Sequence, residues 1–85
     1  MHAAHKLVIE AMEASLGSAI ARQVRAYADG ESFENQNSNA MRRALAWLAM
    51  EWVDQMLKQA LSEDGYDAVE ELAADIEMEL EEVGR

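Results

Sequence analysis

The sequence predicts an all-α protein of three helices, and three observations point to this fold class. The 85 residues include no proline and only four glycines, so few positions interrupt a helix. Apolar residues recur at spacings of three and four, which is the period of one helix face. Polar runs containing glycine interrupt this pattern at residues 30–38 and 62–65. We therefore expect a single domain over residues 1–85, with a long antiparallel hairpin and a third helix over residues 3–28, 39–61 and 66–83.

Helix ends are expected at glycine and at short polar residues. Gly30 is suited to end the first helix, and Asp64 to cap the third. The second helix is preceded by three side chains that can accept a hydrogen bond from its first turn: Asn37, Ser38 and Asn39. Phe33 is the one large apolar residue of the loop 30–38. We expect it to hold the loop against the core.

The first helix has one apolar stripe, with residues every three or four positions: Ala4, Val8, Met12, Leu16, Ile20, Val24 and Tyr27. Gly17 lies in the middle of this helix. Two interpretations remain open. The glycine is tolerated beside a closely packed neighbour, at a cost of about 1 kcal/mol, or the helix breaks near this residue.

The second helix is the most apolar, and its principal stripe is predicted to be core or dimer interface: Met41, Leu45, Leu48, Trp52 and Met56. Further apolar residues widen this stripe, so the helix must be covered from two sides. The first helix covers one side, and the third helix or a second copy of the chain covers the other. Trp47 falls on the opposite, polar side near Arg43, and is predicted to be a partner-binding residue because tryptophan and arginine are enriched at binding hot spots. The alternative is that the third helix or a partner copy folds over Trp47.

The third helix combines a narrow apolar seam, which includes Leu72 and Ile76, with an acidic remainder. Residues 63–85 hold ten acidic residues and one basic residue, whereas residues 1–62 hold seven acidic and six basic ones. We expect an exposed face made of Asp67, Glu70, Glu71, Glu77, Met78 and Glu81. This face is either a solvated surface that keeps the protein soluble or a docking strip for a basic surface of another protein.

Catalysis, cofactors and metal ions are not expected. There is no cysteine, and both histidines, His2 and His5, lie in a terminus that is expected to fray. The acidic third helix repels phosphates, which disfavours direct nucleic-acid binding. No apolar run is long enough to span a membrane, and no signal peptide is recognisable at residues 1–6. The expected location is the cytoplasm.

The segment from Asn39 to Leu48 resembles that of a known group of proteins. With the preceding helix and the acid-, serine- and asparagine-rich loop from Asp29 to Asn39, residues 7–61 are similar to the small acidic helical-hairpin proteins that temperate phages of Pseudomonas make early in infection. Members include a dimeric anti-activator of a quorum-sensing regulator and inhibitors of pilus-assembly ATPases. Anti-CRISPR proteins share the size and acidity. The third helix departs from the simple hairpin.

The resemblance implies an inhibitor that binds a bacterial host protein. Together with the acidic third helix, it leads us to expect a small protein-binding inhibitor, encoded by a phage, that occludes a basic surface of its target. A nucleic-acid-binding surface is one such target. The alternative is a dimeric helical regulatory or assembly module, such as an antitoxin or a chaperone. In both cases we expect a homodimer.

Overall fold

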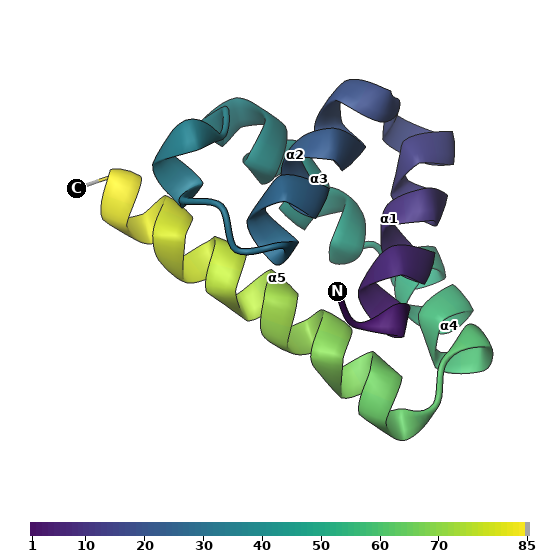
Figure 1. The fold of residues 1–85 in the computed structure, drawn as a ribbon. Coiled ribbons are helices and arrows are strands. Elements are labelled where there is room, and N and C mark those ends of the chain that lie inside the picture. The colour runs from purple at the N-terminus through teal and green to yellow at the C-terminus, as the bar shows by residue number, and fades with distance from the viewer. Residues whose placement is uncertain (85) are drawn as a thin grey trace.

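The computed structural model describes residues 1–84, and the regular structure in that part of the chain is entirely helical (Figure 1). Its elements are α1 (Ala3–Leu16), α2 (Ser18–Ala28), a 3₁₀ turn η1 (Phe33–Asn35), α3 (Ser38–Leu48), α4 (Glu51–Ala60) and α5 (Glu63–Val83). The all-α class is confirmed. The number of helices is corrected from three to five, because the first two expected helices are each broken into two.

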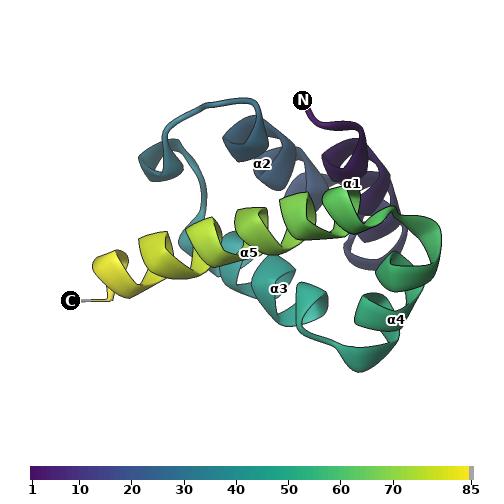
Figure 2. The same ribbon diagram turned by 90° about the horizontal axis from the view of Figure 1, so that it is seen from below.

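The break at Gly17 shortens a helix that would otherwise be longer than the whole molecule. A straight helix over residues 3–28 would extend about 39 Å, which exceeds the 35 Å length of the whole molecule. Only α5 runs the length of the molecule. Figure 1 shows α5 running diagonally along one edge of the bundle, and Figure 2 shows α1 and α2 on one side of it and α3 and α4 on the other.

The first break is at Gly17. Its φ of 97° and ψ of 165° lie in a region that only glycine adopts without strain. The Gly17 N–H donates to the Glu13 carbonyl at 2.9 Å and ends α1, while its own carbonyl accepts from Ala21 at the start of α2. Of the two interpretations left open above, the break is therefore the correct one.

The second break, at Ala49 and Met50, was not predicted, since no glycine or proline marks it. The Met50 N–H bonds to the Trp47 carbonyl at 3.1 Å, which tightens the end of α3. Met50 itself is extended, with ψ at 138°, and α4 begins at Glu51. Glu51 and Asp54 lie in the first turn of α4, where acidic side chains are favoured by the helix dipole.

This break changes which face of the second helical segment is buried. Of the predicted stripe, only Met41 is fully buried. Leu45, Leu48 and Met56 are partly buried and pack against the core. Trp52 is 51% exposed, whereas Trp47, expected on the polar side, is 4% exposed. The prediction that Trp52 is core is therefore wrong, because the extended Met50 interrupts the helix on which that stripe was placed. For Trp47, burial by other parts of the same chain is the correct one of the two interpretations.

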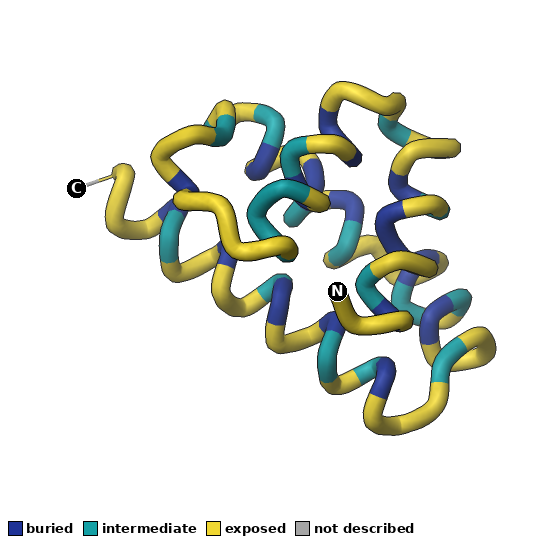
Figure 3. Tube along the Cα trace, in the orientation of Figure 1, coloured by how far each residue is buried: buried dark blue, intermediate teal, exposed yellow. Residues whose placement is uncertain are grey.

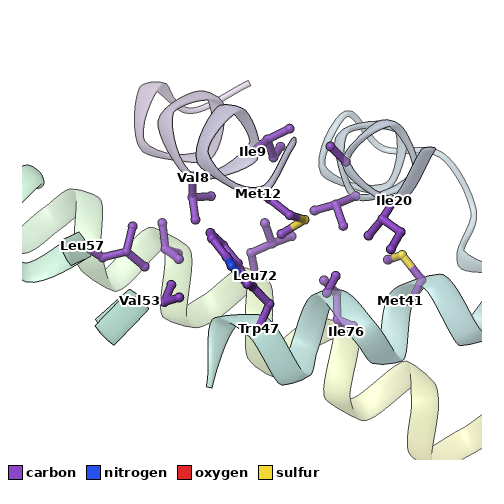
Figure 4. Packing of buried hydrophobic residues seen from close by; sticks show 14 of the residues in the cluster. Val8, Ile9, Met12, Ile20, Met41, Trp47, Val53, Leu57, Leu72 and Ile76 are labelled. Atoms are coloured by element: carbon purple, nitrogen blue, oxygen red, sulfur yellow. The ribbon is translucent and has the colours of Figure 1, made fainter. Parts of the chain in front are cut away.

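The core is formed by apolar residues of all five α-helices together with Phe33 of η1. Figure 4 shows Trp47 pointing into the cluster that also holds Val8, Val53 and Leu72. The predicted seam of α5 is confirmed, with Leu72 5% and Ile76 0% exposed. Gly65 lets α5 approach α1, since a Cβ atom added there would lie 3.3 Å from the Ala4 Cβ.

The helix caps follow the sequence in part. The Asn37 side chain accepts from the Ala40 N–H at 3.0 Å, as predicted. The third predicted helix begins three residues early, and Ser62 rather than Asp64 caps it by accepting from the Gly65 N–H at 3.2 Å. Phe33 is buried and meets Tyr27 edge-on with ring centroids 5.7 Å apart, so it holds the loop to the core as expected.

Side-chain hydrogen bonds tie α5 to the other helices. His5 lies in α1 and bonds through Nε2 to the Ala68 carbonyl at 3.0 Å. The Tyr66 hydroxyl donates to Asp54 of α4, and Asp54 also forms an ion pair with Lys58 at 3.0 Å. The N-terminal segment is therefore packed, contrary to the expected fraying. Within residues 1–84, no helix is both long and apolar enough to cross a membrane.

Candidate protein-binding surfaces

The outer side of α5 carries most of the charge of the protein. Its acidic face, as we call it, consists of nine exposed carboxylates: Glu63, Asp64, Asp67, Glu70, Glu71, Asp75, Glu77, Glu81 and Glu82. Met78 lies among them and is 63% exposed. Figure 3 shows exposed segments along the whole outer side of α5, with buried positions turned toward the other helices. The exposed placement predicted for Asp67, Glu70, Glu71, Glu77, Met78 and Glu81 is confirmed.

No carboxylate of the acidic face forms an ion pair within residues 1–84. The single ion pair in that part of the chain joins Lys58 and Asp54, both in α4. The basic residues of the described helices lie on other elements, chiefly Arg22 and Arg25 of α2 and Arg42 and Arg43 of α3. Arg42 shares a groove with Glu77 and Glu81 but forms no ion pair with them. Within residues 1–84, no ion pair offsets the repulsion among these carboxylates, and a basic partner would relieve it.

Glu79 is the exception among the acids of α5, because it is half-buried and serves the fold. It accepts a hydrogen bond from the Tyr27 hydroxyl at 3.4 Å, which joins α2 to α5. Burial and the nearby charges of Glu79 and Asp75 raise the pKa of Tyr27 above its ordinary value. Glu79 is thus excluded from the acidic face.

The tryptophan available to a partner is Trp52, not the predicted Trp47. Trp52 lies with Met50 and Met56 on a shallow hollow of the α4 surface that Glu51, Gln55 and Gln59 complete. Its ring meets the buried Trp47 ring edge-on, with centroids 6.0 Å apart. Arg43 is exposed on α3, but the burial of Trp47 means that the two do not form the predicted patch.

The signal that could have identified Trp52 is weak. Glu51 and Asp54 are acidic residues at the first and fourth positions of a helix, a pattern that marks helix N-termini. Placing a helix start at Glu51 would have separated α4 from α3. However, two acidic residues are also ordinary on the exposed face of an uninterrupted helix. The sequence alone therefore does not distinguish a new helix start at Glu51 from one continuous helix.

The two histidines have structural partners. His2 caps α1 by accepting from the Ala4 N–H at 3.0 Å, and His5 bonds to the Ala68 carbonyl. Both line a hollow of about 520 Å³ between the N-terminus, the end of α2 and α5. Within residues 1–84 no three His, Cys, Asp or Glu side chains come together in a way that could hold a metal ion.

Comparison with protein families, with curated proteins and with solved structures finds nothing similar to this chain. The resemblance of residues 7–61 to phage proteins therefore remains a prediction. The case for a function depends on the surfaces described above.

Proposed function

We propose that this protein is a binding inhibitor that lays the acidic face of α5 against a basic surface of another protein and so occludes it. The observation that carries the proposal is the row of exposed carboxylates with no ion pair in the described chain. Such a row steers a basic partner toward it and gains Coulomb energy on contact. The resemblance of the hairpin to phage proteins suggests a target in a bacterial host.

The same chemistry suggests which basic surfaces are suitable. Carboxylates spaced along a rigid helix offer a row of negative charges, as the phosphates of a nucleic acid do. A protein site that normally holds phosphates is therefore a fitting target, and occupation by α5 would exclude the nucleic acid. The exposed Met78 adds an unbranched apolar side chain that adapts to irregular surfaces.

The proposal is tested by replacing Asp67, Glu70 and Glu71 together with lysine. These residues lie in the first half of the acidic face and are exposed, so the triple variant should keep its fold. A matched control changes the charge equally elsewhere, by replacing the exposed residues Glu10, Glu13 and Glu34 with lysine. Capture from bacterial lysate at low salt, read by mass spectrometry, compares the bound proteins.

The expected result is a basic protein that the wild type and the control retain and the α5 variant loses, with capture weakening as salt screens the charges. Affinity for the purified target should fall at least about tenfold in the α5 variant. Equal retention by wild type and α5 variant at low salt would show that the acidic face is only a solvated surface.

A second candidate function is an assembly or regulatory module that binds through apolar contact. The exposed Trp52 and Met50, with the partly buried Met56 beside them, favour it, because a tryptophan half-exposed among methionines is an available hot spot. Its binding would be insensitive to salt. Replacing Trp52 with alanine would abolish it, whereas the α5 variant would not.

A further inference from the structure

A groove between α3 and α5 combines an apolar floor with walls of opposite charge. Its floor is made of Leu45, Ala46 and Ala49 of α3 and Leu80 of α5. Arg42 lines the α3 wall, and Glu77 and Glu81 line the α5 wall. The groove encloses about 480 Å³. It lies on the flank of α5 away from the hollow that contains His2 and His5.

The opposite charges of the two walls are not used within the described chain. Arg42 forms no ion pair with Glu77 or Glu81, although all three line the same groove. The charge difference extends to the whole helices. α3 contains two arginines and no acidic residue, whereas α5 contains ten acidic residues and no basic one. Two neighbouring stripes of opposite sign are therefore exposed side by side.

Such a surface is complementary to a copy of itself. In a two-fold dimer the axis lies in the interface, and every contact occurs twice: if one residue of the first copy contacts a second residue of its partner, the reverse contact is also made. With the axis along the groove, the α3 wall of one protomer faces the α5 wall of the other. Arg42 then meets Glu77 and Glu81 of the second copy, and the pairing occurs twice. The short side chains of Ala46 and Ala49 allow the helices to approach closely.

We propose that the α3–α5 groove is the interface of a homodimer, held by reciprocal pairing of Arg42 with Glu77 and Glu81 across an apolar floor. The charge pattern favours a second copy over an unrelated helix, since a copy supplies both signs in the matching order. The proposal does not rest on the inhibitor function. Asp67, Glu70 and Glu71, which test that function, do not line the groove.

The test uses two charge-reversed variants of the full chain, Arg42→Glu and the double variant Glu77→Arg with Glu81→Arg. The mass in solution is measured by analytical ultracentrifugation over a range of concentrations. Wild type should dimerise. Each variant alone should dimerise at least about tenfold more weakly, because it places like charges opposite each other. An equimolar mixture of the two should form a heterodimer, since both pairings are then restored with reversed sign.

Matched controls make the same charge changes outside the groove, with Arg22→Glu on α2 and Glu10→Arg with Glu13→Arg on α1. They should dimerise as wild type does, and circular dichroism should show the same helix content for every variant. A monomeric wild type at every concentration overturns the proposal. So do variants that dimerise unchanged, and variants that fail to pair when mixed. Because Glu77 and Glu81 also belong to the acidic face, capture of a basic target is measured separately, with the variant of Asp67, Glu70 and Glu71, which do not line the groove.

Discussion

Residues 1–62 and helix α5 differ in both length and charge. The first part forms four α-helices of 10 to 14 residues and is nearly neutral, while α5 is one helix of 21 residues and strongly acidic. The short helices pack against one another and against α5, so each of them exposes only a small face, and these faces point in different directions. α5 buries a single seam and presents the rest of its surface along one line. The protein therefore concentrates its charge on the element with the most continuous exposed face.

The apolar patterns of α5 and of residues 39–61 also differ in how well they predict burial. In α5 the stripe that includes Val69, Leu72 and Ile76 is buried as a continuous helix requires. In residues 39–61 the pattern is continuous in the sequence but the helix is not. Trp47 and Trp52 are the residues whose burial differs most from what a continuous helix would give. Variants of these two residues therefore test the break at Met50 most strongly.

Replacing Trp47 with alanine should lower the free energy of unfolding by about 3–5 kcal/mol, because it empties a large volume in the core. The same change at Trp52, which is half exposed, should cost less than about 1 kcal/mol, mainly from the lost edge-on contact. Urea unfolding followed by circular dichroism measures both. Equal losses, or the larger loss at Trp52, would contradict the break at Met50.

Trp47→Phe serves as the conservative control for the core. The Trp47 Nε1–H is buried with no hydrogen-bond partner among the described residues. Phenylalanine removes this unsatisfied donor, whose burial costs about 1–3 kcal/mol. We therefore expect Trp47→Phe to be much less destabilising than Trp47→Ala. If the two variants are equally unstable, the indole N–H of Trp47 donates a hydrogen bond that stabilises the fold, for example to a buried water molecule.

Much of the fold follows from the sequence because local patterns and caps specify it. The α5 seam, the Asn37 cap and the inward position of Phe33 are indicated by the residue types of short segments, and these predictions are confirmed. The Met50 break is marked by no glycine or proline, and the acids Glu51 and Asp54 that follow it are equally ordinary on an exposed helix face. Of the candidate surface, the acidic face was predictable from composition, while Trp52 was hidden by the unpredicted break.

Gly17 provides the second test of the broken half. Gly17→Ala should lower the free energy of unfolding by about 1–3 kcal/mol, since a φ of 97° with ψ of 165° strains any residue with a Cβ atom. A Cβ atom at Gly17 would meet nothing within 4 Å, so the cost comes from the backbone and not from a clash.

The control for Gly17 is Gly84→Ala at the end of α5. Gly84 has an ordinary φ of −78° and room for a Cβ atom, so its replacement should change stability little. Thermal unfolding compares the two variants. A Gly17→Ala protein as stable as wild type would indicate that α1 and α2 join into one continuous helix.

The smallest effect is expected where the two parts are joined, at the hydrogen bond from Tyr66 of α5 to Asp54 of α4. This bond raises the pKa of Tyr66 to about 12, with burial adding to the shift, and it lowers the pKa of Asp54. Because the folded pKa of Tyr66 exceeds the ordinary value of 10.0, its contribution to stability is present below that value. The contribution is lost as pH rises through about 12.

Phenolate absorbance of a Tyr27→Phe variant reports Tyr66 alone. We expect its midpoint near 12 in the folded protein. When Asp54 is also replaced with alanine we expect a lower midpoint, because the hydrogen bond that contributes most to the raised pKa is then absent. Asp64→Ala, which removes an acid of α5 that does not bond to Tyr66, should leave the midpoint in place. An ordinary midpoint in the folded Tyr27→Phe protein would mean that α4 and α5 are held together by apolar packing alone. The side-chain hydrogen bonds that join the acidic helix to the broken segment before it would then be those to α1 and α2, from His5 to Ala68 and from Tyr27 to Glu79.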